Sequence, residues 1–477
     1  MNTRGAAAAV RLSERYDCIV PNRNRLEKRP RFAPASAVIA GKQYIFGMPA
    51  QAGRSLQGSA RNPQTMTEQG EKSMKQVSGG VCAPKGFTAA GVHCGIRKNR
   101  AKRDLALIMS EEPCAAAAVY TKNLVKGAPL AVTRAHLQNG FAQAVVCNSG
   151  NANTCNPGGE AVAEDMCALV AQYAGVSADD VIVASTGVIG QPLDIEPIAA
   201  GMPALAAALS GTGSGEAAEA IMTTDTLVKE IAVSFEAGGA VCTLGGIAKG
   251  SGMIHPNMAT MLVFLTTDAA ISPAMLQSAL SADVQDSFNM ISVDGDTSTN
   301  DMVSILANGL AGNAMIEGPG SDYDAFCTAL AAVTKHLCRT IAKDGEGASK
   351  LLTCRVTGAK DRDAARTVAK SIICSSLFKA AMFGADANWG RVLCAIGYSG
   401  ADVDVDGVSV RFASAAGSIT VCERGRGVPF SEPLAKKVLS EEEIDVLIDL
   451  SDGSACAEAW GCDLTYDYVK INGDYRT

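Results

Sequence analysis

The chain has 477 residues, enough for two or three domains or lobes around a sizeable core. Its composition, 47% hydrophobic and 19% charged, is typical of globular proteins, and no run of eighteen apolar residues predicts a membrane span. The net charge of −7 argues against nucleic acid as the main partner, and four scattered histidines among separate cysteines argue against a metal site.

None of the sixteen cysteines belongs to a C-x-x-C pair, and most lie among apolar residues, as Cys147 and Cys394 do. Free cysteine is often a small buried hydrophobe. The pattern therefore predicts a reducing compartment, the cytoplasm, rather than a disulfide framework.

The first 73 residues differ in composition from the rest. They hold nine Arg and three Lys against five Asp or Glu, a net charge of +7 that leaves −14 for the remainder. Their low apolar periodicity predicts little stable structure. The segment is either a basic organelle-targeting leader or an extension from a start codon placed too early, with the true start at Met74. Glu14, Asp17 and Glu27 favour the extension, because transit peptides are poor in acidic residues.

From Val77 onward, apolar runs alternate with amphipathic stretches, which predicts an α/β fold with mixed sheets layered by helices. In chain order, the first half predicts strands over 104–109 and 144–147, a helix over 159–173 ended by Gly175, a strand over 180–184 that runs into a loop at 185–190, an Ala-rich helix over 196–222 broken near 211–215, and strands over 229–235, 240–247 and 260–266.

In the second half, Ser272-Pro273 is typical of a helix start, with Ser as the N-cap and Pro at the first helical position. Leu276, Leu280, Val284 and Phe288 then repeat every four residues and predict one buried stripe. The remaining predictions are helices over 322–342 and 361–382, a hairpin with Asp406-Gly407 at its turn, and more strand over 444–471.

One segment could carry chemistry, although the chain has no Walker A, H-E-x-x-H, G-x-S-x-G or dinucleotide motif. A Gly-rich loop that follows Gly245 leads into an apolar strand whose first residue is Thr260. A threonine hydroxyl is a poor nucleophile without an adjacent base. If the Ala259–Thr260 peptide were cut, the new α-amine, with a pKa of about 7.7 in model peptides, could take the hydroxyl proton. Alternatively, Thr260 simply begins a strand, as β-branched residues often do.

Nine motifs in a fixed order resemble those of the ornithine acetyltransferases, also called glutamate N-acetyltransferases. The resemblance covers residues 75–477. The motifs occupy 77–87, 148–153, 184–190, 222–225, 249–262, 293–301, 343–347, 386–391 and 468–477.

This resemblance implies a layered α/β/β/α fold, similar to that of β-aminopeptidases and N-terminal-nucleophile hydrolases. It implies that the precursor cleaves itself between Ala259 and Thr260, and that the chains 74–259 and 260–477 stay together as an α2β2 assembly. Acetyl would pass from N2-acetylornithine to Thr260 with release of ornithine, and then to glutamate, giving N-acetylglutamate. Some family members also use acetyl-CoA, which the sequence leaves open here, and no cofactor is implied.

The resemblance also assigns the site residues. Thr186 and Gly187 would form the oxyanion hole. The substrate-binding residues would be Thr223, Lys249, Thr260, Glu346, Asn472 and Thr477. We expect Lys249 to hold a substrate carboxylate and Glu346 to accept a hydrogen bond from an amine. Without the resemblance, these positions would read as an ordinary turn, a surface lysine, a solvated glutamate and a frayed terminus.

Another polar loop contains Asp294, Asp296, Asn300 and Asp301. Its residues resemble a cation loop, but the EF-hand spacing fails, so a structural or site-shaping role is predicted instead of a metal site.

Two alternative functions remain. An N-terminal-nucleophile amidase or aminopeptidase would give the acyl group to water, so ornithine release would not depend on glutamate. A non-catalytic amino-acid-binding module would keep a single uncut chain.

Overall fold

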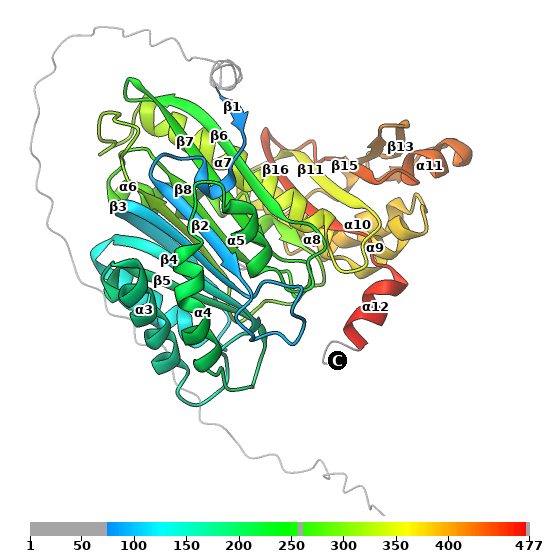
Figure 1. The fold of residues 1–477 in the computed structure, drawn as a ribbon. Coiled ribbons are helices and arrows are strands. Elements are labelled where there is room, and N and C mark those ends of the chain that lie inside the picture. Colours follow the sequence, from blue (N-terminus) through cyan, green and yellow to red (C-terminus); the bar gives the residue numbers. More distant parts are fainter. Residues whose placement is uncertain (1–73, 256–260, 474–477) are drawn as a thin grey trace, which may run out of the picture. The chain divides into compact units, whose positions relative to one another are not determined.

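The computed structural model describes residues 74–255 and 261–473. Two β-sheets, each with parallel and antiparallel neighbours, form the framework, and helices pack against them (Figure 1). The predicted α/β class with mixed sheets is therefore confirmed. The predicted leader or extension 1–73, the cleavage pair Ala259 and Thr260, and the terminal Thr477 lie outside the described residues.

The first sheet contains most of the predicted strands. Its strands are β1 (Lys75–Val77), β2 (Phe87–Val92), β3 (Leu105–Tyr120), β4 (Phe141–Asn151), β5 (Val181–Val188), β6 (Lys229–Ala237), β7 (Ala240–Lys249), β8 (Leu262–Thr267) and β10 (Met302–Ala307). They follow the order β1-β6-β7-β8-β10-β3-β4-β5, and β2 pairs with β3. β8 with β10, and β4 with β5, run parallel. All six residues of β8 are buried, as expected for a strand covered on both faces.

The second sheet is built from the later part of the chain. Its strands are β9 (Ile291–Ser292), β11 (Leu351–Ala359), β12 (Ser409–Ser414), β13 (Gly417–Glu423), β14 (Arg426–Gly427), β15 (Glu443–Asp449) and β16 (Ala455–Cys462). Their order is β14-β13-β12-β15-β11-β16-β9. β11 lies parallel to β15 and antiparallel to β16, so this sheet is mixed as well.

Helices connect and cover the two sheets. They are α2 (Ala128–His136), α3 (Gly159–Ala174), α4 (Glu196–Ala207), α5 (Ser214–Ile221), α6 (Pro273–Asp283), α7 (Ser321–Lys343), α8 (Arg362–Cys374), α9 (Ser376–Phe383), α10 (Trp389–Gly397), α11 (Glu432–Leu439) and α12 (Tyr466–Gly473). α7 contacts β6 and β7 of the first sheet and also β16 and β11 of the second. One long helix therefore joins the apolar interiors of both sheets, and no helix among the described residues combines the length and apolar character needed to cross a bilayer.

Several local predictions are confirmed by their cap geometry. α3 ends at Gly175, whose φ of +77° is the left-handed conformation that glycine adopts readily. Ser272 caps α6 and accepts a hydrogen bond from the Met275 amide, with Pro273 in the first turn. The predicted stripe is buried, although α6 ends at Asp283 and Phe288 lies in a short 3-10 turn.

Two predicted boundaries are wrong. The loop expected at 185–190 is largely strand, because β5 continues to Val188 against its parallel partner β4. The single helix expected over 361–382 is two helices. Ser375, with φ −70° and ψ 108°, leaves the helical conformation and caps α9 by accepting from the Phe378 amide.

The predicted hairpin at Asp406-Gly407 is also wrong. These residues lie in a 3-10 turn, which the Asp404 side chain caps by accepting from the Asp406 amide. A hairpin forms further along the chain, where β12 and β13 pair across the turn between Ser414 and Gly417. The expected strand at 444–471 is β15 and β16 followed by the helix α12.

Candidate active site

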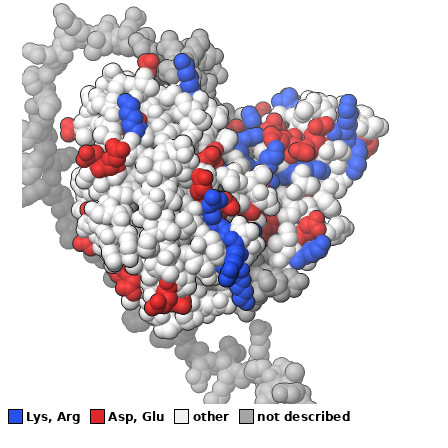
Figure 2. All heavy atoms as spheres, in the orientation of Figure 1, with Lys and Arg blue, Asp and Glu red and all other residues white. Residues whose placement is uncertain are grey.

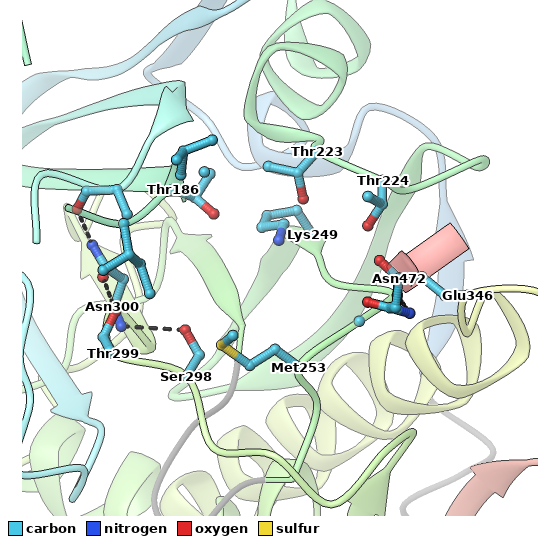
Figure 3. A pocket seen from close by; sticks show the side chains of 15 residues that line it. Thr186, Thr223, Thr224, Lys249, Met253, Ser298, Thr299, Asn300, Glu346 and Asn472 are labelled. Atoms are coloured by element: carbon cyan, nitrogen blue, oxygen red, sulfur yellow. Dashed lines mark hydrogen bonds between the residues drawn. The ribbon is translucent and has the colours of Figure 1, made fainter. Parts of the chain in front are cut away.

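A cavity of about 260 Å³ lies where the ends of β5 and β7 meet the loop before β10, the loop after α7 and the helix α12 (Figure 3). The structure brings six of the predicted site residues together in its wall. They are Thr186, Gly187, Thr223, Lys249, Glu346 and Asn472. Thr260 and Thr477 lie outside the described residues. The cavity thus gathers every predicted site residue that the structure describes.

The two predicted oxyanion-hole residues end strand β5. Gly187 has φ +135°, and a Cβ atom placed on it would lie 2.3 Å from the carbonyl carbon of Gly150 in β4. Only glycine allows this backbone approach. Beside it, the side-chain hydroxyl of Thr186 faces the cavity and has no hydrogen bond to any described residue. A free hydroxyl on a rigid strand end can donate to a ligand oxygen.

Lys249 is the last residue of β7 and pairs in register with Leu262 of β8. The residue is 8% exposed, and its ammonium has neither a hydrogen bond nor an ion pair within the described part of the chain. A buried, unpaired charge is costly unless an opposite charge binds to it. Lys249 therefore offers a site for a carboxylate.

The two acidic groups near Lys249 leave its charge available. Burial raises the pKa of Asp301 well above its ordinary value, although the Ser298 side chain and the Lys249 charge oppose the shift. One buried oxygen of Asp301 has no hydrogen-bond partner among the described residues. Burial alone would raise the pKa of Asp225, but the charges of Lys249 and Lys229 lower it. The carboxylate of Asp225 is already bound by Lys229 and by the Gly250 amide.

Glu346 and Asn472 form the opposite part of the wall. The Asn472 side-chain amide donates to a Glu346 carboxylate oxygen over 2.7 Å, so α12 is tied to the loop after α7. The backbone of Glu346 is held as well, because its amide donates to the Ser251 carbonyl over 2.9 Å. This arrangement fixes one carboxylate where an ammonium group could bind it.

Gly252 allows Glu346 to lie this close to the Gly-rich loop. A Cβ atom on Gly252 would lie 2.4 Å from the Glu346 carboxyl carbon and from both of its oxygens. We expect Gly252→Ala to push the carboxylate aside and raise the KM for an amine-bearing substrate by roughly tenfold, about the effect of losing one charge-assisted hydrogen bond. Steady-state kinetics check this, with Gly215→Ala as control because its added Cβ meets no atom within 4 Å. An unchanged KM would contradict the role of Gly252.

The predicted polar loop shapes the cavity from another side. Asp294 accepts from the amides of Met253 and Ile254 over 2.6 and 2.9 Å. The Asn300 side-chain amide donates to the carbonyls of Ser185 and Ala152. The loop therefore fixes the strand end that carries Thr186. Among residues 74–255 and 261–473, no group of His, Cys, Asp or Glu could hold a metal ion.

Sequence reasoning missed several residues of the wall. They are Ala152, Val188, Ile189, Thr224, Gly252, Met253, Ser298 and Thr299, together with Asn300, for which only a shaping role was expected. The Thr224 hydroxyl lies 2.6 Å from the Ser251 hydroxyl, and Met253 has the unusual φ of +54°. All of these residues lie inside the motifs, which were the available signal, but position in a motif does not reveal which side chains face a cavity.

A network of buried charged residues lies next to the cavity wall. The Lys229 ammonium is fully buried and contacts Asp225 over 2.8 Å and Asp344 over 2.5 Å. Asp225 in turn accepts from the amides of Thr223 and Gly250. Thr223 lies in the cavity wall, and Gly250 directly follows the wall residue Lys249. The network thus links the Met222–Asp225 motif to the Gly-rich loop.

Removing the Lys229 ammonium should lower the stability of the folded protein. We expect Lys229→Met to lower the free energy of unfolding by about 3–5 kcal/mol, because two buried carboxylates would lose their counter-charge. Urea titration followed by circular dichroism measures this. The exposed Lys335, whose nearest acidic oxygen in Glu458 is 3.7 Å away, is the matched control, and Lys335→Met should change the free energy by less than about 1 kcal/mol. Equal effects of the two variants would contradict the role of the network.

Comparisons with known proteins identify a family to which the chain is similar. The model of the ArgJ family matches residues 88–477. The arginine biosynthesis bifunctional protein ArgJ of Symbiobacterium thermophilum is 54% identical over 406 residues, which are 85% of this chain and 100% of that protein. A crystal structure of arginine biosynthesis bifunctional protein ArgJ from Bacillus halodurans is 45% identical and covers 44% of this chain and 97% of its own, with a TM-score of 0.42. A structure of ornithine acetyltransferase complexed with ornithine, from Mycobacterium tuberculosis, is 39% identical and covers 39% of this chain and 100% of its own, with a TM-score of 0.37.

Proposed function

The chain belongs to the ArgJ family, and from this premise we propose that it transfers acetyl from N2-acetylornithine to glutamate in arginine biosynthesis. The products are ornithine and N-acetylglutamate. The observation that carries the proposal is the cavity itself, which joins a buried free ammonium, a fixed carboxylate and several hydroxyls in a volume suited to an amino acid. The enzyme is an acyltransferase.

An amino-acid substrate matches the charges of the cavity. Lys249 binds the α-carboxylate, and Glu346, held by Asn472, binds an amine of ornithine or the ammonium of glutamate. In the view of Figure 3, Lys249 lies between Thr186 and Glu346, and Thr223 lies beside Lys249. Thr477 belongs to the same proposed binding set.

The nucleophile of the proposed reaction is Thr260. The residue directly after it, Met261, is buried, and its carbonyl accepts from the Met302 amide over 2.9 Å. Leu262 then pairs with Lys249 of the cavity wall. Since consecutive Cα atoms lie about 3.8 Å apart, a residue two positions before or after Leu262 is within reach of that wall. These contacts support Thr260 as the attacking group.

Self-cleavage would create the base for this attack. Thr260 attacks the carbonyl of Ala259, an N→O acyl shift gives an ester, and water releases it, leaving chains 74–259 and 260–477. The new α-amine takes the hydroxyl proton when Thr260 attacks N2-acetylornithine. Thr186 and Gly187 stabilise the tetrahedral oxyanion, and one such donor commonly contributes about 3 kcal/mol.

The acetyl group then moves in two steps. Ornithine leaves with the proton from the α-ammonium, and an acetyl ester on Thr260 remains. The amine of glutamate attacks that ester, and N-acetylglutamate leaves. Water must be kept from the ester, because hydrolysis would waste it as acetate.

One experiment separates this function from its rivals. Purified protein is incubated with N2-acetylornithine, with and without glutamate, and ornithine and N-acetylglutamate are measured. Release of ornithine that depends on glutamate supports transfer, whereas equal release without glutamate would identify an amidase. A single uncut chain without turnover would identify a binding module.

Three finer points belong to the same proposal. The two cleaved chains assemble as α2β2, acetyl-CoA serves as an additional acetyl donor, and the protein works in the reducing cytoplasm. The last point is supported by the sixteen cysteines, none in a C-x-x-C pair. Size-exclusion chromatography combined with a denaturing gel tests the assembly.

A further inference from the structure

The loop that joins β2 to β3 carries an unusual group of cations. Over positions 97–103 it holds Arg97, Lys98, Arg100, Lys102 and Arg103 and no acidic residue. Figure 2 shows Lys and Arg atoms gathered in a column on this face, where Figure 1 shows the loop between β2 and β3. The rest of the chain is acidic overall, so this local charge requires an explanation.

Three of these cations have no acidic partner among the residues that the structure describes. Arg103 pairs with Glu219, and the Arg97 guanidinium donates to the Met222 carbonyl. Lys98, Arg100 and Lys102 are exposed and form no ion pair with any residue the structure describes. Three neighbouring positive charges on one loop favour a ligand with several negative charges.

Hydrogen bonds hold the loop between β2 and β3 in a defined conformation. Asp104 is fully buried, and its carboxylate accepts from the amides of Cys94, Gly95 and Arg97 over 2.6, 3.3 and 2.9 Å. The Lys102 amide donates to the Asn99 carbonyl over 3.1 Å, which closes a turn. The carboxylate of Asp104, the acidic residue next to the cations, is thus bound inside the protein, and these hydrogen bonds fix part of the loop backbone that carries the cations.

The base of the loop adjoins the active cavity. A Cβ atom on Gly150 would lie 3.0 Å from the Arg97 Cγ, and Gly150 in turn contacts Gly187 of the cavity wall. The carbonyl that Arg97 binds belongs to Met222, which precedes the wall residue Thr223. Chain length alone keeps Lys102 within roughly 18 Å of Arg97.

The size of the cavity decides what such a surface could bind. About 260 Å³ is below the roughly 300–1,000 Å³ of pockets that enclose drug-sized ligands. It suits an amino acid or the acetyl end of a larger donor, whose remainder must lie outside. A donor with phosphates on a long flexible arm would place them on the neighbouring surface.

We propose that Lys98, Arg100 and Lys102 form a binding site for the phosphates of acetyl-CoA, whose thioester enters the cavity. The site rests on the proposed acetyl transfer through Thr260. There the thioester C–S bond breaks as the bond between acetyl and the Thr260 hydroxyl oxygen forms. The hydroxyl proton passes to the α-amine and leaves with the thiol, and glutamate then takes the acetyl group.

A triple variant, Lys98→Ala with Arg100→Ala and Lys102→Ala, tests the site in the full-length enzyme. Thiol release from acetyl-CoA in the presence of glutamate should show a KM raised on the order of tenfold, the combined effect of three exposed charge pairs. Higher salt should raise the KM of the unmodified enzyme but hardly that of the variant. The N2-acetylornithine reaction should be unchanged, because that substrate carries no phosphate.

The matched control replaces three exposed arginines by alanine and should leave both reactions unchanged. They are Arg411 and Arg426 in strands of the second sheet and Arg424 in the turn between β13 and β14. An unchanged KM for acetyl-CoA in the loop variant would overturn the proposal, and so would an equal fall in both reactions. Tripolyphosphate should inhibit only the acetyl-CoA reaction.

Binding of an RNA oligonucleotide to the loop without any effect on acetyl-CoA kinetics would assign the loop to nucleic acid instead. If the unmodified enzyme turns over N2-acetylornithine normally but releases no thiol from acetyl-CoA, the phosphate site is refuted and the proposed function stands. If it does not turn over N2-acetylornithine, the proposed function itself is refuted.

Discussion

Replacing Thr260 by alanine should give a single uncut chain with no measurable acetyl transfer. The hydroxyl attacks the Ala259 carbonyl during maturation and the acetyl donor during turnover, so both processes lose their nucleophile together. Loss of a nucleophile in covalent catalysis commonly costs at least about 10⁴-fold in kcat. A denaturing gel measures cleavage, and ornithine release with glutamate measures transfer.

Thr260→Ser is the informative control, because it keeps a hydroxyl and, once cleaved, an α-amine. We expect this variant to give two chains and to retain part of the activity. Normal cleavage of Thr260→Ala would show that the Thr260 hydroxyl is not the nucleophile of maturation. Acetyl transfer by an uncut chain would show that the base is not the α-amine of residue 260. Thermal unfolding should be similar for both variants before cleavage, which separates chemistry from folding.

Replacing Lys249 by methionine should have the second largest effect on activity. Both N2-acetylornithine and glutamate carry a carboxylate, so the KM for each should rise and kcat/KM should fall by roughly 10²–10³-fold. This corresponds to about 2–5 kcal/mol for a lost buried charge contact. Steady-state kinetics with each substrate varied in turn test this.

The same substitution should hardly change stability. The Lys249 ammonium has no ion-pair partner among the described residues, and methionine has a similar length without the cost of a buried charge. Lys229→Met provides the contrast, since that ammonium holds Asp225 and Asp344 and its loss should mainly destabilise the fold. Unchanged KM values in a well-folded Lys249→Met variant would exclude Lys249 from carboxylate binding.

Much of the fold follows from local sequence signals. The four-residue repeat after Ser272 gave a buried stripe, and Gly175 and Ser272 marked helix ends that their caps confirm. These signals act within one turn of helix, where neighbouring residues decide the free energy. The motifs likewise identified the six cavity residues, although only through their resemblance to a family.

Local signals failed where a distant partner decided the conformation. β5 extends past Ser185 because β4 lies beside it, and Asp406-Gly407 loses its hairpin because Asp404 caps a 3-10 turn and β12 pairs with β13 instead. The end of the segment expected to be strand forms the helix α12 instead, and this helix places Asn472 beside Glu346. Propensity is a weak guide at such positions, because pairing and burial outweigh it.

By itself, the sequence determined the α/β class, most strands and helices, and which polar residues belong to motifs. It did not determine which of these charges are free. Asp225 and Asp301 both stand in acidic motifs near Lys249, yet the charges of Lys249 and Lys229 lower the pKa of Asp225 against the effect of its burial, while burial raises the pKa of Asp301. Only the tertiary structure decides this, because the free energy of a charge depends on the water it loses and the partners it gains when distant segments pack together.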